Sequence, residues 1–216
     1  MRAWIYDALI LRLTSAWYRA VLERVPVGSR VLDVGIGTGG ALAANAALVR
    51  ERRLEIVGVD IDADYVARCL DHVTRAGLAN RVEVRLETLS AHRAGGARGS
   101  EGADRAGRRY DAIYFSGSFM LMDDPVRALA EACSLLAPGG AVYFTQTFEK
   151  RRSPLLERAK PLLRKLTTID FGRVTYEDDF RRVLAAGAVE LEALDVIGGN
   201  RRRSYVLARA YPRPAA

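Results

Sequence analysis

The stretch that most constrains how this chain folds is residues 31–40, Val-Leu-Asp-Val-Gly-Ile-Gly-Thr-Gly-Gly, where an apolar run leads directly into closely spaced glycines. The apolar run has the length of a buried strand. The glycines permit a tight turn and bring backbone N–H groups close to a ligand, because they carry no Cβ. Residues 41–49 then favour a helix, whose N-terminus offers further donors. A strand, a glycine loop and a helix in this order predict a nucleotide-type cofactor site.

By itself, the glycine loop fits two kinds of cofactor. Gly35, Gly37 and Gly40 match G-x-G-x-x-G, the fingerprint of dinucleotide binding. Two local details argue against a dinucleotide. Asp33 stands where a dinucleotide-binding strand usually has an apolar residue, and Gly39 adds a glycine two positions after Gly37. The rest of the chain also leaves too little length for a separate substrate domain.

Residues 31–39 resemble the first motif of the class I S-adenosylmethionine-dependent methyltransferases, in which two apolar residues, an acid and one apolar residue precede Gly-x-Gly-x-Gly. The resemblance covers about residues 25–211 and implies S-adenosylmethionine as the cofactor. It also implies that Asp33 orients the loop and helps to hold the ammonium group of the cofactor's methionine part. The loop residues that it assigns to the cofactor site are Gly35, Gly37, Thr38 and Gly39.

Strand-like and helix-like segments alternate along the chain, which predicts a parallel sheet with helices on both faces. Gly198-Gly199-Asn200 is a hairpin signal between the last two strands. We therefore expect an α/β, Rossmann-like, doubly wound sheet of seven strands, mostly parallel with one antiparallel strand from the C-terminal hairpin, in a single domain over residues 1–216. The predicted strands are 31–34, 54–60, 82–86, 110–116, 141–145, 189–197 and 204–211.

Two segments lie outside this regular alternation. The apolar-rich residues 1–25 are predicted to form a helical lid, as one helix or as two short helices broken near Thr14-Ser15. Residues 91–109 hold no large apolar side chain, so they cannot bury enough surface to offset the entropy lost on ordering. We expect a flexible surface insertion there, with an arginine-rich arm as the alternative. Further helices are predicted at 40–51, 63–76 and 123–136, with a last one capped by Thr175 and ended by Gly187.

The amino-acid composition limits the classes of binding partner and the cellular compartment that we expect for this protein. The net charge of +7 is compatible with an anionic partner, but the arginines are scattered and alanine is frequent, which is typical of GC-rich coding. Nucleic acid is therefore not the expected partner. Two cysteines and two histidines offer no metal-ligand cluster, and Cys69 and Cys133 are expected to be buried, reduced thiols. No apolar run is long enough to span a bilayer and the N-terminus lacks a signal-peptide pattern, so we expect a cytoplasmic protein.

The resemblance implies further cofactor contacts after the second and third strands. Asp60 ends the second strand and would accept hydrogen bonds from both ribose hydroxyls, with a helix N-cap as the alternative role. Ile61 and Tyr65 match positions that pack on adenine, although Tyr65 also suits a half-buried helix position. After the third strand the family usually has an Asp that reads the adenine amino group. This chain has no Asp there, and Thr88 is the aligned candidate.

The ends of the fourth and fifth strands narrow the chemistry. By resemblance, the loop that begins at Ser116 and Gly117 belongs to the cofactor site and lies beside the transferable methyl group. It lacks the Asn/Asp-Pro-Pro-Tyr/Phe motif of members that methylate adenine bases or glutamine, and the chain lacks the Pro-Cys pair of cytosine methylation. Those acceptors are therefore not expected. Gln146, which leaves the fifth strand, is a candidate to hydrogen-bond the acceptor, with a solvated loop residue as the alternative.

The N-terminal segment carries four aromatic residues, Trp4, Tyr6, Trp17 and Tyr18. Small-molecule members of the family often close this region over the cofactor, and Tyr6, in a Tyr-Asp dipeptide, is a candidate catalytic residue on that basis. Two alternatives stay open. All four aromatics can serve in core packing, or the segment can lie on a membrane surface, because arginines accompany its apolar face.

These observations predict a methyltransferase that acts on a nitrogen, oxygen or sulfur atom of a small molecule or a lipid head group. The chain loosely resembles the quinone-biosynthesis and phospholipid-amine methyltransferases. In such a reaction, an in-line displacement, the protein mainly aligns the nucleophile and excludes water. Two other classes remain: an RNA or protein methyltransferase, which the basic charge favours, and a non-catalytic subunit that binds S-adenosylmethionine.

Overall fold

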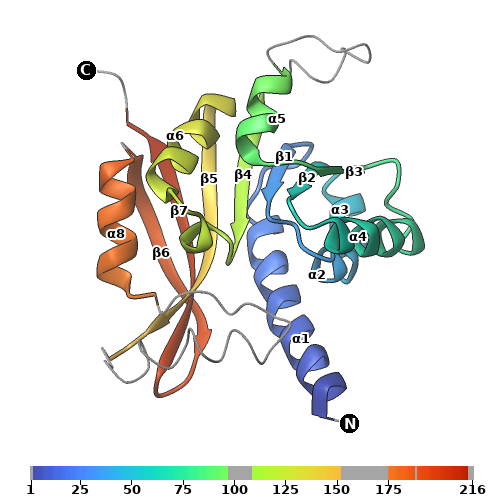
Figure 1. Cartoon of the computed structure of the whole chain (residues 1–216), viewed down its shortest axis with the longest axis horizontal. Helices are drawn as coiled ribbons and strands as arrows, with labels where there is room; N and C mark the ends of the chain where they lie inside the picture. Colours follow the sequence, from blue (N-terminus) through green and yellow to red (C-terminus); the bar gives the residue numbers. More distant parts are fainter. Residues whose placement is uncertain (1, 97–108, 152–174, 188, 214–216) are drawn as a thin grey trace.

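The computed structural model describes residues 2–96, 109–151, 175–187 and 189–213, and it shows a seven-stranded sheet in the order β3-β2-β1-β4-β5-β7-β6 (Figure 1). Neighbouring strands β1 to β5 run parallel, and β7 is antiparallel to both β5 and β6. One strand of seven therefore runs against the others, which confirms the predicted fold class. The strands are β1 Arg30–Val34, β2 Glu55–Asp60, β3 Val82–Leu86, β4 Tyr110–Ser116, β5 Leu136–Glu149, β6 Val189–Gly199 and β7 Arg203–Pro212.

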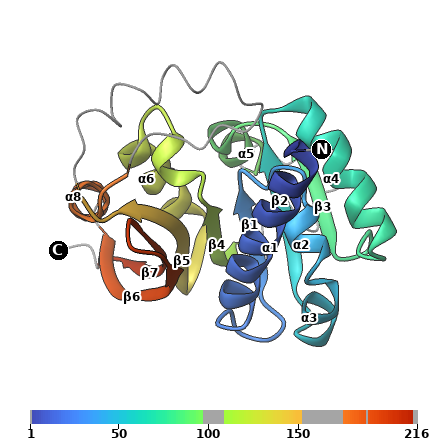
Figure 2. The ribbon, with the colours of Figure 1, turned by 90° about the horizontal axis from the view of Figure 1, so that it is seen from below.

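Helices cover both faces of the sheet (Figures 1 and 2). One face packs against helices α1 to α4, in a core that includes Val21, Leu42 and Val49. The other face packs against α5, α6 and α8, around aromatic side chains such as Phe119 and Phe180. The helices are α1 Arg2–Leu22, α2 Gly40–Ala43, α3 Ala46–Glu51, α4 Ala63–Arg75, α5 Leu89–Gly96, α6 Pro125–Leu135 and α8 Glu177–Ala186, with a 3₁₀ turn η1 at Phe119–Leu121.

The strand order reverses between β1 and β4, since β2 and β3 lie on one side of this pair and β5, β7 and β6 lie on the other. At such a point the connections after the two strands diverge to opposite sides, which opens a crevice at their carboxyl ends. The glycine loop follows β1 and the Ser116–Gly117 turn follows β4. The topology therefore brings both predicted cofactor segments to the same edge of the sheet.

Helix α1 is one continuous helix, so the alternative of two short helices broken near Thr14-Ser15 is wrong. The hydroxyls of Thr14 and Ser15 donate to the Leu11 carbonyl oxygen, at 3.3 and 2.5 Å, so these polar side chains are satisfied within the helix. The helix predicted over residues 40–51 is instead two, α2 and α3, separated at Asn45. The Asn45 side-chain nitrogen donates to the carbonyl oxygens of Ser15 (2.9 Å) and Ala41 (2.8 Å). A buried amide thus breaks the helix and ties it to α1.

Two further predictions need correction. The N-cap of α8 is Tyr176 rather than Thr175, and it makes no side-chain capping bond, although Gly187 ends the helix as expected. Residues 91–96 belong to α5, so the predicted insertion over 91–109 begins too early, and residues 97–108 lie outside the described part of the chain. Residues 91–96 hold no large apolar side chain, but a buried polar residue among them, His92, fastens α5.

The anchoring of α5 is a hydrogen-bond relay. His92 is 6% exposed, its Nδ1 donates to the Glu87 carboxylate at 2.8 Å, and its Nε2 lies 2.8 Å from the Tyr110 hydroxyl. In the tautomer that carries its proton on Nδ1, the His92 Nε2 accepts a hydrogen bond from the Tyr110 hydroxyl. The Arg30 guanidinium stacks 4.7 Å from the centre of the Tyr110 ring. This relay joins the end of β3 to the start of β4.

Candidate cofactor and active site

The glycine loop owes its shape to left-handed backbone conformations that only glycine adopts at low cost. Gly35, Gly37 and Gly39 have φ angles of 78°, 61° and 68°. A Cβ at Gly35 would stand 2.7 Å from the Ser118 Cβ, and one at Gly39 would collide with the Cys69 sulfur. At Gly37 nothing lies within 4 Å of that position among the described residues. Two glycines are therefore required by packing, and the middle one presents bare backbone to open space.

Asp33, the residue before the last one of β1, has a partner for only one of its two carboxyl oxygens among the described residues. It is 1% exposed, and its Oδ2 accepts a 2.6 Å hydrogen bond from the Tyr18 hydroxyl of α1. Its Oδ1 is buried and has no hydrogen-bond partner within the described ranges. Burial raises the pKa of Asp33 to about 7; the Tyr18 hydrogen bond opposes this rise and the Asp60 charge adds to it. A buried, unpartnered carboxylate oxygen suits a cationic ligand group such as an ammonium.

Asp60, at the end of β2, bridges the loop and the next helix. Its Oδ2 accepts from the Gly37 N–H at 2.8 Å and its Oδ1 from the Asp62 N–H at 3.0 Å. The alternative role of Asp60 as the cap of α4 is excluded, because Asp62 is that cap and accepts from the Asp64 and Tyr65 N–H groups. Asp60 therefore does not cap the helix, and its carboxylate lies against the glycine loop at Gly37.

The ends of β2 and β3 leave large apolar side chains exposed. Ile61 is 75% exposed and Leu86 is 55% exposed, and Leu86 pairs with Asp60 in the sheet register. Tyr65 is half-buried on the first turn of α4. Thr88 is exposed, and its hydroxyl oxygen accepts from the Ala91 N–H at 3.1 Å, so it caps the start of α5. Ile61 and Leu86 thus form an exposed apolar surface beside the Asp60 carboxylate. Such a surface is suited to packing against a flat base.

The turn after β4 is fastened to both neighbouring strands. The Gly117 N–H donates to the Thr145 carbonyl oxygen of β5 at 2.9 Å, and the Ser118 hydroxyl donates to the Val34 carbonyl oxygen of β1 at 2.5 Å. Gly117 has a φ of 69°, and Ser116 is half-buried. These bonds hold the turn against the glycine loop.

Two buried side chains near this turn, on opposite faces of the sheet, each have one polar atom without a partner among the described residues. Trp17 is 8% exposed and its Nε1 has no hydrogen-bond partner in the part of the chain that the structure describes. Its ring lies 3.6 Å from the position of a Cβ on Gly117 and 5.9 Å from the Tyr205 ring centre. Gln146 is 7% exposed within β5, so it is not a solvated loop residue; its Nε2 bonds the Thr175 hydroxyl at 3.4 Å and its Oε1 is unpartnered in the same described part. The Tyr6 side chain lies outside the described residues.

The sequence did not predict the contacts by which three residues hold the site together: Tyr18, which it offered only as a lid or core aromatic, His72 and Ser118. His72 on α4 donates from Nδ1 to the Thr38 carbonyl oxygen at 2.8 Å and so fixes the glycine loop from the helix side. Its position three residues after Cys69, on the inward face of α4, is the pattern that could have revealed it. Tyr18 and Ser118 gave no such signal, because their partners lie on segments distant in sequence.

The described residues include no group of three His, Cys, Asp or Glu side chains placed to hold a metal ion. Cys69 is buried, as predicted, whereas Cys133 is only half-buried, and burial raises the pKa values of their thiols to about 12 and about 11. Both thiols therefore stay protonated near neutral pH. Within the same ranges, no helix combines the length and the apolar character needed to cross a membrane.

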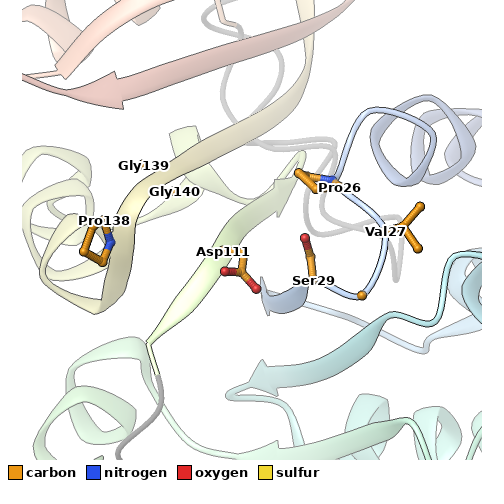
Figure 3. Close-up of a pocket in the computed structure, with 8 residues that line it drawn as sticks. Pro26, Val27, Ser29, Asp111, Pro138, Gly139 and Gly140 are labelled. Carbon is orange, nitrogen blue, oxygen red and sulfur yellow. The ribbon is translucent and has the colours of Figure 1, made fainter.

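A hollow of about 340 Å³ lies at the opposite edge of the sheet, beside the start of β1 and β4 (Figure 3). Its one carboxylate, Asp111, accepts from the Arg30 N–H at 2.7 Å. The remaining lining is Pro26, Val27, Gly28, Ser29, Pro138, Gly139 and Gly140. None of these described residues has a buried polar side-chain atom without a partner. The hollow therefore differs from the edge at the carboxyl ends of the strands, where such atoms are found.

Comparison with known proteins decides the family. A protein-family model described as a methyltransferase domain matches residues 6–184. The chain belongs to this family. The methyltransferase is 26% identical over 166 residues to the phosphatidylethanolamine N-methyltransferase of Cereibacter sphaeroides, across 76% of this chain and 74% of that protein. It is 25% identical over 177 residues to the ubiquinone biosynthesis O-methyltransferase of Methylococcus capsulatus, across 80% of this chain and 68% of that protein.

Solved structures show the same fold. The methyltransferase superposes with a TM-score of 0.62 and 14% identity on an S-adenosylmethionine-dependent methyltransferase from Geobacter sulfurreducens in complex with S-adenosyl-L-homocysteine, covering 92% of this chain and 90% of that one. The family and the fold establish S-adenosylmethionine as the cofactor of this class I methyltransferase. The unpartnered Asp33 oxygen and the bare backbone at Gly37 fit that molecule's ammonium and methionine part.

Proposed function

We propose that the methyltransferase transfers the cofactor's methyl group to an atom of a small molecule or lipid head group, and that this atom is an amine nitrogen. The observation that carries the choice of acceptor atom concerns the two histidines of the chain, His72 and His92. His72 is bonded to the glycine loop and His92 to Glu87 and Tyr110. Both ring nitrogens of His92 are bonded and His72 holds the glycine loop through Nδ1, so neither histidine is positioned chiefly for the acceptor. An amine in its neutral form needs no general base and fits such a site.

The proposed division of labour follows the edge of the sheet. Asp33 and the loop residues Gly35, Gly37, Thr38 and Gly39 hold the methionine part, and Asp60 accepts from the ribose hydroxyls. Ile61, Tyr65 and Leu86 pack on adenine. The Thr88 hydroxyl oxygen already accepts from the Ala91 N–H, so its O–H is the group that can donate a hydrogen bond to the base. Ser116 and Gly117 line the place of transfer. S-adenosylmethionine supplies a methyl group activated by a sulfonium centre, so the chain's residues need only bind, align and exclude water.

On the acceptor side, Trp17 and Gln146 offer a donor and an acceptor that the described residues leave unpartnered. A buried polar group without a partner costs free energy until a ligand satisfies it. We assign both to recognition of the acceptor, and Tyr6 remains a candidate for the same role. The names of the relatives, one acting on phosphatidylethanolamine and one in ubiquinone biosynthesis, support a lipid or small-molecule acceptor.

We further propose that α1 serves as the lid rather than as a membrane anchor. Trp17 and Tyr18 of α1 are buried against the site. Two of its neighbouring arginines are engaged within the protein, since Arg19 pairs with Glu23 at 2.9 Å and Arg24 with Asp195 at 3.1 Å. These pairs leave fewer free cations for anionic lipids.

The experiment is a transfer assay with methyl-labelled S-adenosylmethionine and three acceptor sets: phosphatidylethanolamine in neutral vesicles, soluble primary amines, and phenols. We expect label in an amine product, and loss of it in a Gln146→Leu variant that still binds S-adenosylhomocysteine. Transfer to phenols alone would overturn the amine assignment. Transfer only to RNA or protein would replace the proposed function with that class, and cofactor binding without transfer to fractionated extract would identify a non-catalytic subunit.

A further inference from the structure

The side chains of Tyr18 and Asp33 form a buried contact between α1 and the cofactor site. The Tyr18 hydroxyl donates to the Asp33 Oδ2 at 2.6 Å, and the two residues are 3% and 1% exposed. Tyr18 also packs edge-on against the Tyr114 ring, 5.1 Å between centres. The contact therefore forms only when α1 lies in place on the sheet.

The titratable groups that interact with Asp33 come from four elements, and none of them is a cation. These groups are Tyr18 from α1, Tyr114 from β4, Asp60 from β2 and Cys69 from α4. Tyr114 shares its hydroxyl with the Thr145 hydroxyl at 2.8 Å, and the Cys69 thiol stays protonated. Among the described residues, the Tyr18 hydroxyl is thus the single hydrogen bond that favours the charged form of Asp33.

We propose that Tyr18 is a positioning residue that couples the seating of α1 to cofactor binding, by holding the Asp33 carboxylate toward the cofactor's ammonium, and that binding releases a proton from Asp33. This inference rests on the proposed role of Asp33 in the cofactor site. It goes beyond that role, because it makes a residue of the lid helix part of the determinant of cofactor affinity.

The proton balance follows from burial. Burial raises the pKa of Asp33 to about 7, so a substantial part of the free protein carries a proton on this group near neutral pH. An ammonium placed at the free Oδ1 requires the carboxylate, so the Asp33 proton leaves to solvent and the ammonium keeps its own. Cofactor affinity then rises with pH through about 7 and falls again only at higher pH, where the ligand's α-amino group loses its proton. Removing the Tyr18 hydroxyl raises the Asp33 pKa further and shifts the rising limb to higher pH.

The test is calorimetry with S-adenosylhomocysteine at pH 6, 7 and 8, each in two buffers of different ionisation enthalpy. The wild type should release a substantial fraction of a proton per ligand at pH 7. Tyr18→Phe should bind about tenfold more weakly than the wild type at pH 6, the loss expected for one hydrogen bond to a charged group, and the deficit should shrink at pH 8. Tyr114→Phe is the matched control, because it removes a buried hydroxyl that does not bond Asp33, and its affinity ratio should not vary with pH.

A second variant keeps the test decisive if Tyr18→Phe is unstable. Asp33→Asn has nearly the same shape and cannot ionise, so it should bind weakly, with no proton release and no rising limb. A wild type that binds S-adenosylhomocysteine without proton release, or a Tyr18→Phe deficit that is equal at all three pH values, overturns the coupling and leaves the proposed function standing. A wild type that fails to bind S-adenosylhomocysteine overturns both.

Discussion

The two halves of the active edge are built differently. On the cofactor half, backbone groups and short side chains bond one another, as Gly37 does to Asp60 and Thr38 to His72. On the proposed acceptor half, two long buried side chains each keep one polar atom unpartnered in the described structure, the Nε1 of Trp17 and the Oε1 of Gln146. Backbone geometry suits a ligand that never changes, whereas unsatisfied side chains suit one that differs between relatives. Asp33 joins the halves, because its Tyr18 partner belongs to α1, which carries Trp17 as well.

The largest effect should come from the charge at this junction. The folded-state pKa of Asp33 is raised to about 7 from an ordinary value near 3.8, so the folded protein binds more protons than the unfolded chain between these values. Stability contributed by the protonated form is therefore present below about pH 4 and lost as pH rises to above 7, by about 4 kcal/mol. Chemical denaturation without cofactor should show this slope in the wild type and lack it in Asp33→Asn. Equal slopes would mean that Asp33 is not buried as described.

Next in size is the rigidity of the cofactor half. Gly39→Ala places a Cβ against the Cys69 sulfur at a φ of 68°, which should cost about 3 kcal/mol of unfolding free energy. Gly37→Ala is the comparison, because its Cβ meets no described atom and only the positive φ costs, about 1 kcal/mol. Denaturant titration measures both. Similar losses for the two variants would contradict the packing argument.

Asp60→Ala removes the proposed ribose acceptor together with the acceptor of the Gly37 and Asp62 N–H groups, and it should lower cofactor affinity more than stability. We expect S-adenosylhomocysteine binding to weaken by about 1.5–3 kcal/mol, the usual range for hydrogen bonds to a charged group. Asp62→Ala serves as a control, because it removes the cap of α4 and should lower stability while leaving binding nearly unchanged. Calorimetry separates the two; a larger binding loss in Asp62→Ala would remove Asp60 from the ribose site.

The smallest effect should appear on the acceptor half. Trp17→Phe removes a donor that has no partner in the described structure, so cofactor affinity should stay within twofold. Catalytic efficiency toward the amine acceptor should fall about fivefold, as expected for one neutral hydrogen bond of about 1 kcal/mol, mainly through a higher KM. Steady-state kinetics at saturating cofactor measures this. A matching loss in cofactor affinity would place Trp17 on the cofactor half and break the comparison.

Local patterns predicted the elements of the cofactor half well, and for a physical reason. The strand boundaries of β3 and β4 and the glycine loop depend on residues that are neighbours in sequence, so apolar runs and glycines specify them. The predictions that were wrong depend on distant contacts. Asn45 breaks a helix because it reaches Ser15, and α5 extends into the expected insertion because His92 reaches Tyr110.

The sequence by itself determined the pattern of strands, the glycine loop and the methyltransferase family with its cofactor. Each of these depends on residues that are close together in sequence, so a short motif is enough to predict it. The tertiary structure alone decided that Tyr18 bonds Asp33, that Ser118 closes on Gly35, and that Trp17 and Gln146 are buried with polar atoms unpaired in the described chain. Those contacts depend on how α1 and the turn after β4 dock on the sheet. Docking is set by the packing of many side chains at once, and no short stretch of sequence encodes it.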